Sequence, residues 1–322
     1  MKYNIKKFAA VLLSALLIFS FAACGASVPT IGICQYGEHA SLDNCRIGFL
    51  QGLTDAGLVE GKDYRIDYQN AGFDDNITTQ IGQSFSANNV ALMCAIATPA
   101  ATACYAAAED KDIPVIFTAI TDPVIANLVD GNVTGTSDRL PVTAQLDLIR
   151  AVQPDADTIG ILYTTSEPNS VSAIAEYEAN AAAYGFAIDA IGVTAQTEVT
   201  QAADTLISHG VDCLSNLTDN NVVGVLGAIL EKTNEAGIPV YGSEVEQVRL
   251  GCVAAAGIDY VALGRQTGEM AARVLRGEAK AGEIPYETIS EYGIYVNLTA
   301  LTEMGLTLPA AVADKAIEAA AE

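Results

Sequence analysis

The stretch Cys213–Leu230, CLSNLTDNNVVGVLGAIL, contains one complete unit of the fold that we predict for this chain. Its first five residues are typical of a buried strand, and an apolar pattern typical of a helix follows Asn221. Between these two segments, Thr218, Asp219 and Asn220 form a polar tip. A carboxylate at the tip of a buried strand needs a partner, because an isolated buried charge is very costly. The stretch therefore raises the question of what Asp219 binds.

The same order of strand, polar tip and helix recurs along the whole chain. Short apolar runs alternate with amphipathic segments, and the runs include TIGICQY, ALMCAIA, IPVIFTAI, TIGILYT, IPVYG and LGCVAAAG. Such alternation predicts parallel sheets with helices on both faces. It occurs twice, first from about residue 28 to about residue 142 and again from DADTIGILY onward. We therefore predict an α/β protein of two similar, Rossmann-like lobes.

The N-terminal residues have the layout of a secretory signal. Lys2, Lys6 and Lys7 precede an apolar run from Phe8 to Ala23, which is short for a membrane span. The run ends in FAAC, which resembles a bacterial lipobox and would place a lipid on Cys24. The alternative is a membrane-spanning helix. We expect residues 1–23 to be removed and the remaining chain to be lipid-anchored outside the bacterial cell membrane.

The charge of the chain excludes one class of partner. Residues 1–23 hold three of the 16 Lys and Arg residues and none of the 39 Asp and Glu residues, which leaves 13 basic and 39 acidic side chains. A body of such negative charge repels nucleic acid and anionic lipid surfaces. We therefore expect no nucleic-acid partner.

The cysteines favour packing over chemistry. Export would permit disulfides, and a Cys34–Cys45 bridge is one possible pair. Four of the six cysteines after Cys24 lie in apolar runs, where cysteine usually acts as a small core residue. The chain has no C-x-x-C motif, so we expect neither a metal site nor a redox site, and no cofactor.

Polar residues gather where the predicted strands end and the helices begin, which is where open parallel sheets bind ligands. Taken alone, each of Thr98, Asp122, Ser166 and Asp219 is better explained as a helix cap. Together they form a set of candidate ligand-binding side chains, and these are Gln35, Tyr36, Thr98, Thr121, Asp122, Ser166, Asn169, Ser170, Asp219, Asn220 and Tyr241.

This chemistry suits a zwitterion. We predict Thr98 as a helix N-cap with Pro99 in the first turn, followed by the small residues Ala100 and Ala101. The free amides of such a helix start form a site for a carboxylate. Asp219, across the cleft, would take the ammonium group of the ligand through charge-assisted hydrogen bonds.

Several segments resemble the tryptophan/tyrosine-type substrate-binding lipoproteins of bacterial ABC importers. They are IGICQYGEHASLDNCRIGFLQGL, IATPAATA, VIFTAITDPV, NVTGTSDRLPV, IGILYTTSEPNS, LTDN and AAAGIDYVALGRQTGEMAARVLRG, and they cover nearly all of the chain after the signal. The chain departs from that pattern at EHAS, where EHP is commoner in the family.

The resemblance implies a type I periplasmic-binding-protein fold whose lobes are joined by three strands. Lobe one would be 28–142 plus 253–283, and lobe two would be 143–252 plus 284–322. The ligand would be a free aromatic amino acid (Tyr, Trp or Phe), delivered to ABC permease subunits by a monomer. Its carboxylate would lie on Thr98, Ala100 and Ala101 with Ser170, and its ammonium group on Asp219 with Asn220. Tyr36, Phe117 and Tyr241 are candidates to stack on its ring, although each would also suit an ordinary core.

Three alternatives stay open. An enzyme is disfavoured, because we find no G-x-S-x-G, metal cluster or glycine-rich phosphate loop in the sequence. A surface adhesin would use the same fold to bind another protein. The third alternative keeps the binding role but changes the ligand of this chain to a branched-chain amino acid, a nucleoside or a sugar, and the absence of Trp disfavours sugar.

Overall fold

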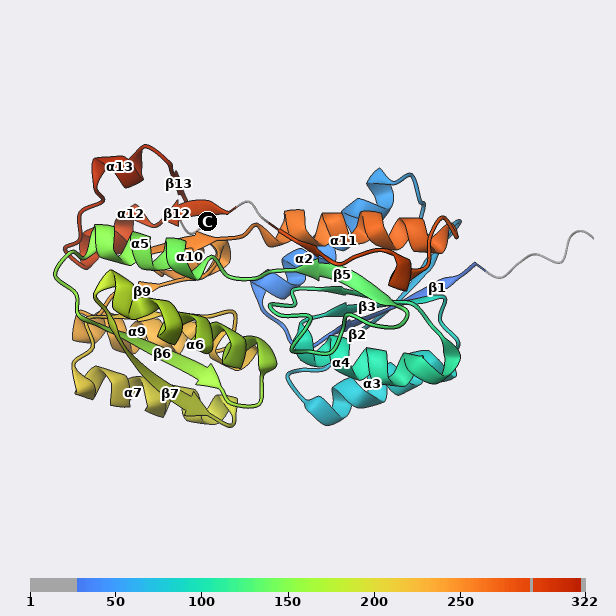
Figure 1. Ribbon diagram of the computed structural model, residues 1–322, viewed down its shortest axis with the longest axis horizontal. Coiled ribbons are helices and arrows are strands. Elements are labelled where there is room, and N and C mark those ends of the chain that lie inside the picture. The colour runs from blue at the N-terminus through green and yellow to red at the C-terminus, as the bar shows by residue number, and fades with distance from the viewer. Residues whose placement is uncertain (1–27, 290–291, 320–322) are drawn as a thin grey trace, which may run out of the picture.

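The computed structural model describes residues 28–289 and 292–319. It contains two α/β lobes that lie side by side (Figure 1). Expected lipidation at Cys24 falls outside the described residues. Within the described part of the chain, no helix combines the length and apolar character that a membrane crossing needs.

The first lobe is a six-stranded sheet, in the order β11-β5-β4-β3-β1-β2, in which every pair of neighbouring strands is parallel. Helices α2 and α11 cover one face and helices α3 and α4 the other (Figure 1). Its elements are β1 (Thr30–Gln35), α2 (Ala40–Asp55), β2 (Arg65–Asn70), α3 (Asp75–Ala87), β3 (Leu92–Ile96), α4 (Thr98–Ala108), η1 (Glu109–Lys111), β4 (Val115–Thr118), β5 (Val133–Ser137), α11 (Tyr260–Leu275), η4 (Ala281–Glu283) and β11 (Glu287–Thr288).

The second lobe has a four-stranded parallel sheet, in the order β7-β6-β8-β9, and a three-stranded sheet, in the order β10-β12-β13. Its elements are α5 (Val142–Val152), β6 (Thr158–Thr164), α6 (Pro168–Asn180), η2 (Ala181–Tyr184), β7 (Ala187–Val193), η3 (Gln196–Glu198), α7 (Val199–His209), β8 (Cys213–Ser215), α8 (Asn220–Val223), α9 (Leu226–Ala236), β9 (Val240–Tyr241), α10 (Val245–Leu250), β10 (Ala254–Gly257), β12 (Gly293–Val296), α12 (Leu298–Glu303), α13 (Ala310–Ala313) and β13 (Ala316–Glu318). The small sheet departs from the expected all-parallel pattern, because β10 and β12 are antiparallel.

The chain crosses between the lobes three times, after β5, after β10 and between β11 and β12. The boundaries differ from those implied by the resemblance at two segments. Strand β10, expected in lobe one, pairs with β12 of lobe two, and its Ala254 and Ala256 lie in the core of lobe two. Strand β11, expected in lobe two, pairs with β5 of lobe one. The crossing residues are extended, so sequence patterns alone did not separate them from the neighbouring strands.

Helices α2 and α11 meet through glycines, and this contact joins the two chain segments that build the first lobe. A Cβ atom on Gly52 would lie 2.1 Å from the carbonyl oxygen of Arg265, and one on Gly268 would lie 2.2 Å from that of Phe49. Gly48 and Gly264 are equally close to the facing backbone. The four glycines therefore allow the two backbones to approach more closely than any other residue would permit.

Each lobe has its own apolar core. Both are made from the strand-like runs and helix faces that the sequence predicted, with Phe49, Phe85 and Phe117 fully buried in the first lobe and Tyr177 and Tyr241 in the second. All six cysteines after Cys24 are buried and unpaired, so the possible Cys34–Cys45 bridge is absent from the structure.

Candidate functional site

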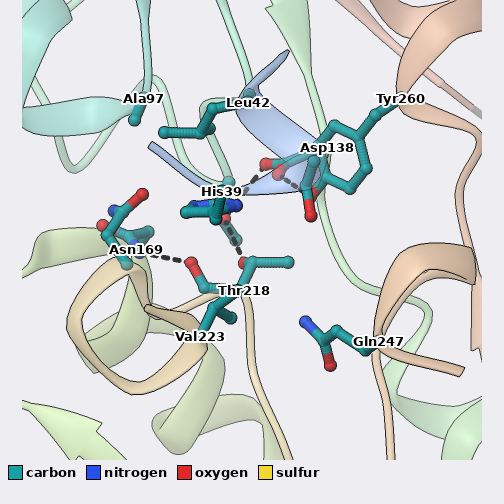
Figure 2. Close-up of a pocket in the computed structure, with 13 residues that line it drawn as sticks. His39, Leu42, Ala97, Asp138, Asn169, Thr218, Val223, Gln247 and Tyr260 are labelled. Carbon is teal, nitrogen blue, oxygen red and sulfur yellow. Dashed lines mark hydrogen bonds between the residues drawn. The ribbon is translucent and has the colours of Figure 1, made fainter. Parts of the chain in front are cut away.

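A small cavity of about 20 Å³ lies between the lobes (Figure 2). The first lobe contributes residues from the start of α2, from the segments that follow β3, β4 and β5, and from α11. The second lobe contributes residues from α6, α8 and α10 and from the segment that follows β8. The lining residues are His39, Ser41, Leu42, Ala97, Ala119, Thr121, Asp138, Asn169, Thr218, Asn220, Val223, Gln247 and Tyr260. Residues of both lobes enclose this cavity, so a ligand enters it when the lobes move apart.

Asp138 is the carboxylate that lines this cavity. It follows β5 at the first crossing between the lobes and is only 2% exposed. Its Oδ1 accepts a hydrogen bond from the hydroxyl of Thr121 at 3.1 Å, and its Oδ2 accepts one from the hydroxyl of Tyr260 at 2.5 Å. Burial raises the pKa of Asp138, and the two hydroxyl donors partly oppose that rise. Since no Lys or Arg lines the cavity, this carboxylate is suited to meet a cationic group of a ligand.

Two helix starts of the first lobe face the same cavity. Ser41 and Leu42 in the first turn of α2 line it, as does Ala97, which directly precedes α4. The first amides of a helix have no acceptor within the helix, so both starts offer free N–H groups. Ala97 has a φ of 81°, an uncommon value for alanine, and the Oγ1 atom of Thr98 is buried without a hydrogen-bond partner. These donors are suited to bind an anionic group.

Asp219, the residue on which the sequence analysis centred, is fully buried, and its carboxylate is already surrounded by donors of its own lobe. Its two oxygens accept hydrogen bonds from the amide and hydroxyl of Thr164 at 2.5 and 2.8 Å, from the hydroxyl of Ser170 at 2.6 Å and from the amide of Val222 at 3.0 Å. The side chain therefore joins β6, α6 and α8 to one another. It is not among the residues that line the cavity.

Glu167, which directly precedes α6, binds residues at the starts of α6 and α8. Its carboxylate accepts hydrogen bonds from the amides and side chains of Asn220 and Asn221 and from the side chain of Asn169. Burial and the neighbouring Asp219 raise the pKa of Glu167 to about 8. Glu167 and Asp219 together fix the start of α8, and this helix carries Asn220 and Val223 into the cavity.

The lobes also contact each other directly. Asn44 on α2 donates a hydrogen bond to Glu246 on α10 at 2.9 Å, and Ser172 on α6 donates one to Asp122 at 3.2 Å. At the cavity itself, the hydroxyls of Thr121 and Thr218 lie 3.4 Å apart. These bonds hold the lobes against each other in the described arrangement.

The structure brings only part of the predicted set to the cavity. Thr121, Asn169 and Asn220 line it, and Thr98 adjoins it through Ala97. Tyr36 and Ser166 line a separate groove between α3, α4 and the start of α6. Thr98 is the first residue of α4 rather than its N-cap, because Ala97 takes the N-cap position.

The remaining predicted residues serve the scaffold. Ala100, Ala101 and Phe117 are buried in the core of the first lobe, and Tyr241 is buried in that of the second. Ser170 donates to Asp219, and Asp122 caps the turn that follows β4 through the amides of Val124 and Ile125. Gln35 donates hydrogen bonds to the carbonyl of Gly37 and to Asp43 and accepts one from Tyr68. It therefore stabilises the segment between β1 and α2.

Sequence reasoning missed five lining residues that carry polar chemistry: His39, Ser41, Asp138, Gln247 and Tyr260. Asp138 lies within one of the segments that carry the family resemblance, NVTGTSDRLPV, and this was the signal that could have identified it. In the described part of the chain, no group of three or more His, Cys, Asp or Glu residues is arranged to hold a metal ion.

Comparison with known proteins identifies the family. The family model for ABC transporter substrate binding proteins matches residues 30–320. The chain belongs to this family. The family binds solutes, and substrate-binding proteins of ABC importers act outside the cytoplasm. This chain is 40% identical over 273 residues to the Tyrosine-binding protein of Clostridioides difficile (strain R20291), across 83% of this chain and 78% of the relative.

Solved structures of relatives agree with the two-lobe fold. A Streptococcus pneumoniae ABC domain in complex with L-Trp is 33% identical, with a TM-score of 0.87 over 91% of this substrate-binding protein and 99% of the relative. A ligand-free, open substrate-binding protein with adhesive properties from Clostridium difficile is 36% identical, with a TM-score of 0.69 over 92% and 100% of the two chains. This chain therefore superposes better on the L-Trp complex than on the open relative.

Proposed function

We propose that this substrate-binding protein binds a free aromatic amino acid between its lobes and delivers it to an ABC permease. The observation that carries the proposal is the pairing of opposite chemistries around one cavity. A buried carboxylate, Asp138, lies on one side, and the free amides at the starts of α2 and α4 lie on another. A ligand that carries both an ammonium and a carboxylate group can pair with the carboxylate of Asp138 and with these free amides.

Asp138 replaces Asp219 as our candidate for the ammonium site, because Asp219 is fully paired within its lobe. Thr121, Asn169 and Asn220 stay candidates for direct contact with the ligand. Thr98 stays a candidate for the carboxylate, since its buried hydroxyl has no other partner. A relative at 40% identity is named for binding tyrosine and another at 33% holds L-Trp, which supports the aromatic class for the ligand.

The proposal includes the location of the protein. The basic, apolar and small-residue order of residues 1–24 favours cleavage before Cys24 and a lipid on its thiol. Cells that express the full chain and are grown with radiolabelled fatty acid should then label the unchanged chain but not a Cys24→Ala variant. Equal labelling of both chains, or of neither, would contradict the lipid on Cys24.

A thermal-shift screen tests the ligand class. The chain from Cys24 onward, unfolded in denaturant, dialysed and refolded to remove any bound ligand, is screened against the twenty amino acids, nucleosides and sugars. A ligand at one hundred times its dissociation constant adds about 2.7 kcal/mol to the free energy of unfolding. We expect the largest shifts with Tyr, Trp or Phe. Shifts with nucleosides alone would contradict the proposal, and no shift with any solute would favour adhesion, the property of the open relative.

A further inference from the structure

His39 lies in the middle of the cavity (Figure 2). Both ring nitrogens are buried, and neither forms a hydrogen bond of good geometry, although the side chain of Asn220 lies near enough to raise the pKa of the ring against the effect of burial. The residue holds the N-cap position of α2 but forms no side-chain cap bond there. The imidazole is therefore not needed by the helix that carries it.

A buried imidazole without partners requires an explanation, because leaving a buried polar group unsatisfied costs free energy. Burial lowers the pKa of His39 to about 4, so the ring is neutral at physiological pH. A neutral imidazole offers one N–H donor and one acceptor nitrogen. The ring is therefore suited to a neutral partner that can donate or accept a hydrogen bond.

The surroundings of His39 are aromatic. Its ring is nearly parallel to that of Phe73, with an interplanar angle of 5° and centroids 6.2 Å apart. Phe73 in turn meets the ring of Tyr36 edge to face at 5.8 Å. A Cβ atom on Gly37 would lie 2.0 Å from the Phe73 ring, so this glycine is what lets Phe73 pack here. His39 is the member of this aromatic cluster that lines the cavity, and Phe73 packs behind its ring.

Both charged groups of the proposed ligand already have counterparts in the cavity. Asp138 is assigned to the ammonium group, and the helix starts with Thr98 are assigned to the carboxylate. A polar group on the side chain of the ligand is what remains for the imidazole. We propose that His39 hydrogen-bonds an O–H or N–H group on the aromatic ring of the ligand, so that the site selects tyrosine or tryptophan over phenylalanine. This inference rests on the proposed function.

The experiment compares Tyr with Phe, which differ by one hydroxyl group, and adds Trp, which carries an indole N–H. Isothermal titration measures the dissociation constants of L-Tyr, L-Trp and L-Phe for the refolded, ligand-free wild type and for His39→Leu and His39→Gln variants. We expect the wild type to bind Tyr at least about tenfold more tightly than Phe, since Phe leaves the imidazole unpaired. The His39→Leu variant should reduce this ratio to less than about threefold, mainly through weaker binding of Tyr, while His39→Gln keeps part of it.

The other histidine of the chain supplies a matched control. His209 ends α7 far from the cavity lining and pairs with Asp189 at 2.7 Å. A His209→Leu variant should keep the wild-type ratio of Tyr to Phe binding.

Three outcomes would overturn the inference. Equal binding of Tyr and Phe by the wild type would do so, whether or not the variants fold. An unchanged ratio in a folded His39→Leu variant, checked by its thermal unfolding, would also do so. Failure of Tyr, Trp and Phe alike to bind the wild type would overturn the proposed function itself, and this inference with it.

Discussion

The side-chain amide of Asn44 donates a hydrogen bond to Oε1 of Glu246 over 2.9 Å, which joins α2 of the first lobe to α10 of the second. Glu246 keeps a second partner within its own helix, because Arg249 donates to it at 2.6 Å. When the lobes open, the bond from Asn44 breaks, but Glu246 stays paired with Arg249.

An Asn44→Ala variant should shift the ligand-free protein toward the open arrangement. Loss of a hydrogen bond of about 1 kcal/mol changes the ratio of closed to open molecules by about fivefold. Small-angle X-ray scattering should therefore give a larger radius of gyration for ligand-free Asn44→Ala than for the wild type. The exposed Asn234→Ala serves as the control and should scatter like the wild type. Identical scattering from the two variants would show that this bond does not hold the lobes closed.

Asp219 is expected to stabilise the second lobe rather than to bind the ligand. An Asp219→Ala change leaves the amide of Thr164 and the hydroxyl of Ser170 without their acceptor in a buried place. We expect it to lower the free energy of unfolding by roughly 3 kcal/mol or more. Asp74→Ala, which removes an exposed N-cap on α3, should cost only about 1 kcal/mol. Urea unfolding measures both, and equal losses would contradict the bracing role of Asp219.

The buried carboxyl groups make the ligand-free protein less stable as the pH rises. Burial raises the pKa of Glu244 to about 7, and burial with Asp219 raises that of Glu167 to about 8. Both groups are ionised in the unfolded chain above pH 6.5 but still hold protons in the folded protein, so their stabilisation is lost as the pH passes through 7 and 8. The free energy of unfolding should fall by roughly 1–3 kcal/mol between pH 6.5 and pH 8.5.

Glu244→Gln should reduce this loss, because Gln does not titrate and can still accept a hydrogen bond at the start of α10. Thermal unfolding at a series of pH values measures the effect. A melting temperature that stays flat or rises between pH 6.5 and pH 8.5 in the wild type would contradict the burial of these carboxylates.

The glycine contact between α2 and α11 should tolerate no side chain. Gly268→Ala places a Cβ atom 2.2 Å from the carbonyl oxygen of Phe49, so one helix has to move away. We expect a loss of about 2–3 kcal/mol in the free energy of unfolding. Gly227 lies in α9 with open space around its Cα atom, and Gly227→Ala should stabilise the protein by about 0.5–1 kcal/mol. If Gly268→Ala raises the free energy of unfolding as Gly227→Ala does, the close packing of α2 against α11 is contradicted.

The alternation of strands and helices was visible in the sequence because each element carries its own pattern. Glycine also marks helix ends, because Gly210 directly follows α7 and Gly237 directly follows α9, and both have positive φ values. Thr121, Asn169 and Asn220 were found because the carboxyl ends of parallel strands meet at one edge of a sheet. Local sequence patterns were therefore enough to predict the two lobes and three of the residues that line the cavity.

The chemistry of the carboxylates could not be predicted in this way. Asp219 and its partner Thr164 lie 55 positions apart, so the sequence did not show that this carboxylate is satisfied within its own lobe. Asp138 lies at a crossing between lobes rather than at a strand-to-helix tip, and its partner Tyr260 is 122 positions away. Whether a buried acid is paired or available depends on such distant contacts, which only the three-dimensional structure shows.

Asp138 is central to the proposed function, and its role can be measured directly. Isothermal titration compares the binding of L-Tyr to the refolded wild type, to Asp138→Asn and to Asp147→Asn, an exposed acidic position on α5. We predict that Asp138→Asn weakens binding by about tenfold to one hundredfold while the protein stays folded, because it removes the charge that meets the ammonium group. Asp147→Asn should bind like the wild type. Wild-type affinity in a folded Asp138→Asn variant would contradict the ammonium site, and with it the pairing of opposite charges in the cavity.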